Sequence, residues 1–229
     1  MIKDNLNSIN NKIKTICDRI SRDPKSIVVV AVTKYTDVSS MKEAVDAGVK
    51  HIAENYVQDA VKKFEELDKS GVKVNKHFIG HLQSNKVKLI LPVVDLIQSV
   101  DSFKLAQEIE KQAIKINKRV DILVQVNISG EKQKSGVEKN AGFQLVKDIA
   151  GLKNIRVLGL MLIAPLTDDQ NMIRECFNGL RLLRDEIIEK MGVQNNIEMK
   201  YLSMGMSADY EIALEEGANM LRIGSAIFK

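Results

Sequence analysis

The sequence contains little cysteine. Its 229 residues include only Cys17 and Cys176, which lie far apart and inside helical patterns. Two such residues do not indicate a disulfide framework or a thiolate metal site. We therefore expect a protein of a reducing compartment, the cytoplasm.

Long apolar runs are also missing. The longest uninterrupted one, Ile27 to Val32, has six residues, whereas a helix that crosses a bilayer needs about 20. The opening segment MIKDNLNSINNKIK is polar and amphipathic and lacks the apolar region of a secretory signal. The sequence thus predicts neither a membrane segment nor export.

Neither sign of charge dominates. The formal net charge is only +4, and Lys and Glu are interspersed instead of forming a basic arm, so nucleic-acid binding is not expected.

A metal site is not expected either. His77 and His81 bracket a strand-to-loop passage without nearby Cys or acidic ligands, and His51 begins a strand.

The chain has no linker rich in Pro, Gly or Ser, and 45% of its residues are hydrophobic, which is enough for one buried core. Apolar residues recur at helical spacing from Leu6 to Ile20, and Pro24 ends that region. We expect one domain over residues 1–229, with residues 1–23 forming a helix that packs on it.

Beyond Pro24, short β-branched runs alternate with amphipathic helical stretches, such as Phe103 to Ile116 and Ile173 to Ile188. Eight such alternations predict an α/β protein, a single TIM-type (β/α)8 barrel with parallel strands. An open doubly wound sheet is the competing interpretation, because three of the runs are short. The runs are Ile27 to Val32, His51 to Ala53, His77 to Ile79, Val94 to Ile97, Ile122 to Val126, Val157 to Leu162, Lys200 to Ser203 and Met220 to Ile223.

A lysine follows the first of these runs. Reactive groups of such barrels lie at the carboxyl ends of the strands, and Lys34 comes two residues after Val32. We expect its stem to be buried and its ammonium to lie at the barrel mouth, where burial would lower its pKa and favour a nucleophilic amine. A solvated lysine is the alternative, and for a lone lysine it is the more common case.

The far end of the sequence offers partners for an anion. Ser207 is expected to cap a helix from Ala208 to Glu216, and Gly205 and Gly224 let the backbone approach a ligand closely. Asp209 would repel an anion unless it points away. An ordinary capped helix with two turn glycines fits the same pattern.

Arg222 lies inside the last run, where strand alternation directs it to the same side as Gly224. It forms either a structural ion pair or a contact with a ligand. In the loop after the fifth run, Lys132, Lys134 and Ser135 could reach an anionic ligand, although a solvated charged loop is the favoured interpretation.

Several motifs together resemble the pyridoxal phosphate homeostasis protein family. The likeness runs from about Val28 to Phe228, and the combination of AVTK, ENY, HFIGHLQSNK, SMGMSAD and RIG is highly specific. Members of this family look like the barrel half of alanine racemase standing alone. The resemblance implies a fold-type III barrel that binds pyridoxal 5'-phosphate (PLP).

The resemblance also implies roles for individual residues. Lys34 of AVTK would hold PLP as a Schiff base, the internal aldimine, and Arg222 of RIG would face the pyridine nitrogen. The phosphate would be held by Ser207 and by the Gly224 and Ser225 turn. Ser225 stands for a more usual Thr but keeps the hydroxyl group.

Further residues are implied to line the same site. Asn55 of ENY matches a family residue beside the cofactor, and His81, Asn127 and Met204 are additional candidates for this wall. Ala53 and Asp59 replace a more usual Gly and Glu around ENY.

An arginine opposite the pyridine nitrogen would keep that nitrogen unprotonated and weaken the electron sink. Alanine racemase adds a catalytic tyrosine from a further β domain, which we do not expect here. The favoured interpretation is a monomeric carrier, reservoir or regulator in PLP homeostasis, with little or no turnover and with PLP-dependent apoenzymes as its partners. The alternatives are a PLP-dependent amino acid racemase of low activity, a lysine-dependent aldolase and a cofactor-independent regulatory binding module.

Overall fold

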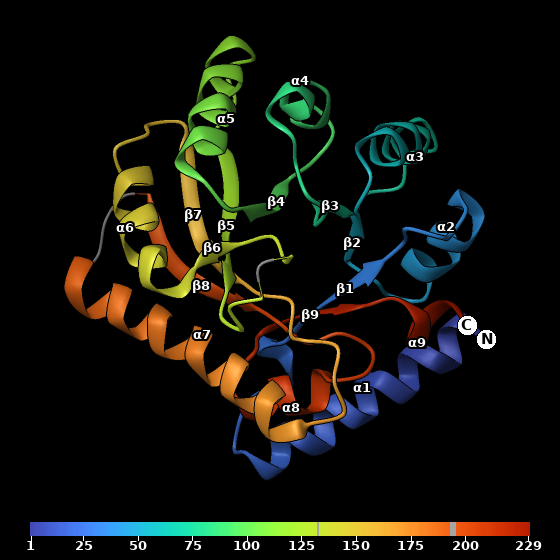
Figure 1. Cartoon of the computed structure of the whole chain (residues 1–229). Helices are drawn as coiled ribbons and strands as arrows, with labels where there is room; N and C mark the ends of the chain where they lie inside the picture. The colour runs from blue at the N-terminus through green and yellow to red at the C-terminus, as the bar shows by residue number, and fades with distance from the viewer. Residues whose placement is uncertain (132, 193–195) are drawn as a thin grey trace.

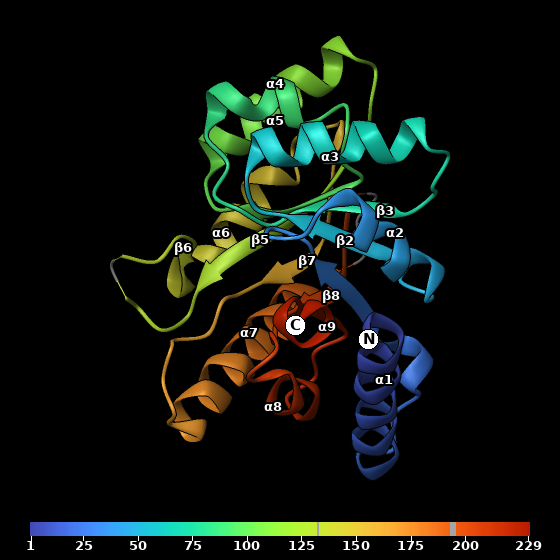
Figure 2. The ribbon, with the colours of Figure 1, turned by 90° about the vertical axis from the view of Figure 1, so that its right-hand side faces the viewer.

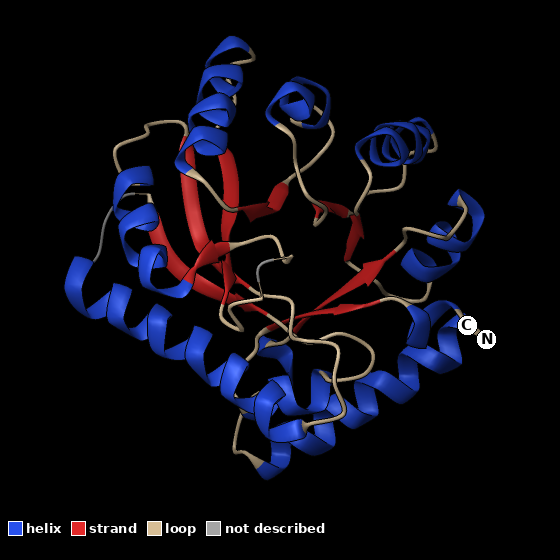
Figure 3. Ribbon diagram, in the orientation of Figure 1, coloured by secondary structure: helices blue, strands red, loops and turns tan. Residues whose placement is uncertain are grey.

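The strands close into a parallel barrel wrapped by helices (Figures 1 and 3). A computed structural model describes residues 1–131, 133–192 and 196–229. Within them, strands pair in the order β4, β3, β2, β1, β9, β8, β7, β5, and a pairing between β4 and β5 closes the ring. The barrel strands are β1 (Val28–Val32), β2 (His51–Glu54), β3 (Asn75–Phe78), β4 (Leu96–Val100), β5 (Val120–Asn127), β7 (Ile155–Met161), β8 (Ile197–Ser203) and β9 (Met220–Ile223).

The ring confirms the predicted (β/α)8 barrel and shows that the open sheet is wrong. Each of the eight predicted runs overlaps one barrel strand. An additional two-residue strand, β6 (Val137–Glu138), pairs with the end of β5 outside the ring.

Helices cover the outer face of the barrel (Figure 3). The predicted stretches Phe103 to Ile116 and Ile173 to Ile188 correspond to α5 and α7. No helix in the described part of the chain combines the length and apolar character that a bilayer-spanning segment needs. The helices are α1 (Ile2–Arg19), α2 (Val38–Asp46), α3 (Val57–Lys69), α4 (Val87–Ile90), α5 (Phe103–Lys115), α6 (Lys139–Ile149), α7 (Gln170–Met191), α8 (Tyr210–Glu215) and α9 (Ser225–Phe228), with 3-10 turns at Pro24–Ser26 and Ser84–Lys86.

The main apolar core lies between the strands and this helical layer. Phe64 of α3 and Phe177 of α7 are fully buried in it. A second, smaller apolar cluster fills the barrel interior and includes Val30, Leu123 and Met220. Side chains alternate between these two regions along each strand because successive residues of a strand point to opposite faces.

The opening helix packs where the chain ends. The buried face of α1 contacts α8 and α9, and Figure 2 shows the two chain ends close together. Asn5 donates from its side chain to the carbonyl of Ile227 at 3.0 Å. The predicted stripe from Leu6 to Ile20 therefore supports the last turn of the barrel wall.

Closure of the barrel makes the first and last strands neighbours. β1 and β9 pair in parallel, with Val30 opposite Arg222. Because parallel strands end at one mouth, the loop that carries Lys34 and the segment after Arg222 emerge side by side. This register brings the two halves of the candidate site together.

Candidate functional site

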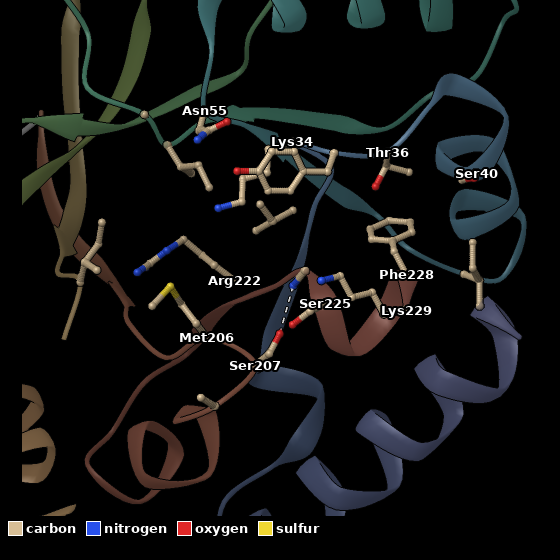
Figure 4. A pocket seen from close by; sticks show the side chains of 18 of the residues that line it. Lys34, Thr36, Ser40, Asn55, Met206, Ser207, Arg222, Ser225, Phe228 and Lys229 are labelled. Atoms are coloured by element: carbon tan, nitrogen blue, oxygen red, sulfur yellow. Dashed lines mark hydrogen bonds between the residues drawn. The ribbon is translucent and has the colours of Figure 1, made fainter. Parts of the chain in front are cut away.

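A cavity of about 900 Å³ opens at the carboxyl ends of the strands (Figure 4). Segments from both ends of the chain form its walls, and the side chains of Lys34 and Arg222 both extend into it. Of the nine residues that the family resemblance implies for the cofactor site, seven line this one cavity: Lys34, Asn55, His81, Ser207, Arg222, Gly224 and Ser225.

Lys34 lies at the rim of this cavity. Its side chain is exposed, so the buried stem expected from the sequence is wrong. The reason is the turn at Lys34 and Tyr35, which carries the chain out of the barrel directly after the buried Thr33. The Lys34 ammonium lies 5.1 Å from the centre of the Tyr35 ring, within the range of a cation–π contact.

A buried carboxylate holds the loop beneath Lys34. Glu54, at the end of β2, is fully buried and accepts hydrogen bonds from Thr33 Oγ1 at 2.6 Å and from Lys63 Nζ at 2.8 Å. Lys63 also donates to the Thr33 carbonyl at 2.8 Å. This cluster fixes the backbone on the amino side of Lys34.

Arg222 forms the floor of the cavity. It is 3% exposed, and its guanidinium donates from Nη1 to Ser203 Oγ at 2.8 Å and from Nη2 to the Leu162 carbonyl at 2.7 Å. Burial lowers the pKa of Arg222 to about 10, although nearby Asp209 opposes the shift, so the group stays charged at neutral pH. A guanidinium has five N–H donors, which leaves donors for a ligand.

Two backbone amides lie next to Ser207 at the cavity wall. The hydroxyl oxygen of Ser207 accepts from the amides of Gly224 at 3.4 Å and Ala226 at 3.3 Å, which ties the loop after β8 to the start of α9 (Figure 4). Together with the exposed Ser225, these groups form a set of hydrogen-bond donors that suits an anion.

Ser207 does not cap the following helix, so that prediction is wrong. α8 begins at Tyr210, and a turn over residues 207–209 precedes it. Asp209 occupies the N-cap position, and its carboxylate accepts from the Met206 amide at 2.6 Å. The Asp209 side chain is buried and does not line the cavity, which removes the expected repulsion of an anion.

Gly205 does not line the cavity. Its φ of +91° is a conformation that favours glycine, and a Cβ there would lie 2.6 Å from Ala213 Cβ. The glycine therefore allows the turn and the close approach of α8. Gly224 has room for a Cβ, with Val32 at 3.4 Å.

Asn55 contributes to the wall from the end of β2. Its Oδ1 atom is buried and has no hydrogen-bond partner among the described residues, which is unusual for a buried polar atom. Gly80 lies against it: a Cβ at Gly80 would lie 1.8 Å from the Asn55 carbonyl oxygen. The glycine after β3 thus sets the position of Asn55.

Asn127 and Met204 do not line the cavity. The Asn127 side chain accepts from Ser129 Oγ and the Gly130 amide and donates to the Glu131 carbonyl, all within the turn after β5. Met204 is fully buried in the main core.

Some other residues that line the cavity were not named, or were not favoured as site residues, in the sequence analysis. Lys134 and Ser135, from the loop after β5, line the cavity, while Lys132 lies outside the described residues. Gln125 lines it too and donates to the Ser135 carbonyl at 3.1 Å. The sequence signal that could have identified Gln125 is its place as the single polar residue within the apolar run from Ile122 to Val126. Met206 lines the wall beside Arg222.

The comparisons with known proteins fit this architecture. The family described as alanine racemase, N-terminal domain, matches residues 5–229. The chain belongs to this family. An alanine racemase structure from Clostridium difficile shares the fold, with a TM-score of 0.75 at 20% identity over 98% of this chain and 56% of that chain.

Curated relatives place the chain in a more specific family. The chain is 39% identical over 223 residues to the pyridoxal phosphate homeostasis protein of Aquifex aeolicus, covering 97% of this chain and 95% of the relative. It is 34% identical over 230 residues to the protein of the same name in Escherichia coli K12, covering 99% and 95%. The chain is therefore a member of the pyridoxal phosphate homeostasis protein family.

Two solved structures are similar over almost their full length. One is an unknown protein from Bifidobacterium adolescentis, with a TM-score of 0.92 at 35% identity over 99% of this chain and 94% of that chain. The other is PipY of Synechococcus elongatus with PLP bound, with a TM-score of 0.86 at 29% identity and complete coverage of both chains.

Proposed function

We propose that the cavity binds PLP through Lys34, with Arg222 at the ring nitrogen. The observation that carries the proposal is that Lys34 and Arg222, far apart in sequence, line one cavity. The donors fit the ligand: a primary amine for an aldehyde, a buried cation that can only donate for a pyridine nitrogen, and the Ser207, Gly224 and Ser225 wall for a phosphate. PipY, which is similar over its whole length, has PLP bound.

When bound, PLP supplies an aldehyde that condenses with a primary amine and a ring that withdraws electrons. Lys34 offers the amine at the solvent-exposed rim, where amines from other molecules can reach it. Arg222 keeps its own proton at neutral pH and therefore donates to the ring nitrogen without protonating it. Such a site favours reversible holding of the cofactor over turnover.

We infer that the protein acts in intracellular PLP homeostasis as a carrier, reservoir or regulator. The relatives that carry this function in their names support the role. PLP-dependent apoenzymes are the expected recipients. The protein is expected to be a cytoplasmic monomer.

Visible absorption tests the proposal. The full chain mixed with PLP should show a band of the covalently bound cofactor, which Lys34→Ala abolishes and Lys62→Ala, a change on the exposed side of α3, preserves. Borohydride reduction and peptide mass mapping should place the label on Lys34. A colourless wild type, or a label on the other cavity lysines Lys134 or Lys229, would contradict the proposal.

Slow amino acid racemisation is the second candidate, because Tyr35 lines the cavity beside Lys34. Its side chain is 83% exposed, and an acid or base must be held in a fixed geometry to act. Exchange of the alanine Cα hydrogen with deuterium, lost in Tyr35→Phe, would establish this activity. We expect exchange that is slow and unchanged in that variant.

A further inference from the structure

A line of buried hydrogen bonds crosses the barrel interior from Arg222 toward the amino-terminal mouth. Arg222 Nη1 lies 2.8 Å from Ser203 Oγ, and Ser203 Oγ lies 2.6 Å from Gln98 Oε1. Gln98 Nε2 lies 2.7 Å from His77 Nδ1, and His77 Nε2 lies 3.1 Å from His51 Nδ1. The five side chains come from β9, β8, β4, β3 and β2.

The bonds of Arg222 and Ser203 set the direction of this line. A guanidinium can only donate, so the Ser203 oxygen accepts from Arg222, and the Ser203 hydroxyl donates to Gln98 Oε1. The Gln98 amide then donates to His77 Nδ1. His77 must carry its proton on Nε2 and donate to His51 Nδ1, so both histidines are neutral in one tautomer.

The burial of these groups makes that direction strict. Ser203 and Gln98 are fully buried, and His77 is 2% exposed. With the Gln98 amide reversed, the buried Ser203 hydroxyl would lose its acceptor at Gln98 Oε1, and a buried donor without an acceptor is costly in a low dielectric. Burial, and to a smaller extent His51, lower the pKa of His77 to about 3, in agreement with a neutral ring.

We propose that Gln98 is a positioning residue of the cavity, which orients Arg222 through Ser203 and selects the tautomers of His77 and His51. Its carboxamide is suited to this place because it accepts at one end and donates at the other. Gln98 Nε2 also lies 3.3 Å from Met220 Sδ, which holds the amide plane. The effect on a ligand rests on the proposed function, whereas the direction of the line does not.

The tautomers can be measured without a cofactor. The chain has three histidines, so long-range proton–nitrogen NMR spectra of the imidazole rings are simple, and the exposed His81 serves as an internal reference. His77 and His51 should each show a protonated Nε2 and a bare Nδ1 at pH 7. A proton on Nδ1 of His77 would overturn the proposal, and this measurement requires no variant.

Gln98→Glu gives a sharper version of the same test. A carboxylate still accepts from Ser203 but cannot donate, so the His77 proton should move to Nδ1. Retention of the wild-type His77 tautomer in this variant would contradict the assigned role of Gln98.

Gln98→Met tests the effect on Arg222. Loss of the Gln98 bond to Ser203, which holds Arg222 in place, should raise the Kd for PLP about tenfold. This change corresponds to one hydrogen bond of about 1.4 kcal/mol. The visible absorption band of bound PLP should also shift. The matched control is Ser99→Ala, at the adjacent buried residue, whose hydroxyl has no hydrogen-bond partner within residues 1–131, 133–192 and 196–229. It should leave Kd and band unchanged.

The outcomes separate the two proposals. A wild type that does not bind PLP contradicts the proposed function, while the NMR result still decides the direction of the line. A wild type that binds PLP, together with a Gln98→Met variant of unchanged Kd and band, contradicts the positioning role alone.

Discussion

Glu54 and Lys63 form an ion pair of 2.8 Å beneath the loop that carries the candidate Schiff-base lysine. The carboxylate is fully buried, and in the part of the chain that the structure describes its second oxygen has no hydrogen-bond partner. Because Lys63 also holds the Thr33 carbonyl, one ammonium both compensates a buried charge and anchors the start of the loop.

Removal of that ammonium should destabilise the fold. Lys63→Met leaves Glu54 as an unpaired buried charge, which costs about 3 kcal/mol in the free energy of unfolding. Urea unfolding measures the change. Adding Glu54→Gln to Lys63→Met should recover most of the loss, and Lys12→Met, which breaks the exposed pair with Glu211, should change little. Equal effects at Lys63 and Lys12 would disprove the explanation.

Ser207 should discriminate between phosphorylated and unphosphorylated ligands. Ser207→Ala removes a hydroxyl from the proposed phosphate wall and disturbs the amides of Gly224 and Ala226 that it now binds. A hydrogen bond to a charged group contributes about 1.5 to 3 kcal/mol, so the Kd for PLP should rise at least about tenfold. Titrations with pyridoxal, which lacks the phosphate, provide the control. A parallel loss for both ligands would place the phosphate elsewhere.

A methyl group at Gly80 should displace Asn55. In Gly80→Ala the new Cβ would lie 1.8 Å from the Asn55 carbonyl oxygen, so the backbone at the end of β2 must move. We expect a loss of more than about 2 kcal/mol in unfolding free energy, together with weaker PLP binding. Gly151→Ala, where the nearest atom is 3.5 Å away, should be tolerated. Similar stabilities of the two variants would argue against this steric role.

His77 should make stability depend on pH. Its pKa is lowered to about 3 in the folded protein, mainly by burial, and returns to about 6.5 on unfolding. Between these values the unfolded chain binds a proton that the folded chain refuses, so the free energy of unfolding falls as pH falls below about 6.5. At pH 5 the loss is about 2 kcal/mol. Urea unfolding at pH 7 and 5 should show a smaller pH effect in His77→Gln, and an identical effect would contradict the prediction.

Much of the fold followed from local patterns. The runs of β-branched residues around Val28 and Leu123 marked barrel strands, and helical spacing located α5 and α7, because a strand or helix must bury one face whatever its partners are. Motif resemblance supplied Lys34 and Arg222 as cavity residues, since both lie at strand ends that a barrel brings to one mouth.

Long-range geometry decided the rest. The sequence by itself determined the barrel, its parallel strands and the residue types at its mouth. Only the tertiary structure showed that Lys34 is exposed, that Ser207 accepts from α9 instead of capping α8, and that Gln98 connects Arg222 with His77. Such contacts join strands that are remote in the chain. They depend on barrel register and burial, which no local spacing of residues encodes.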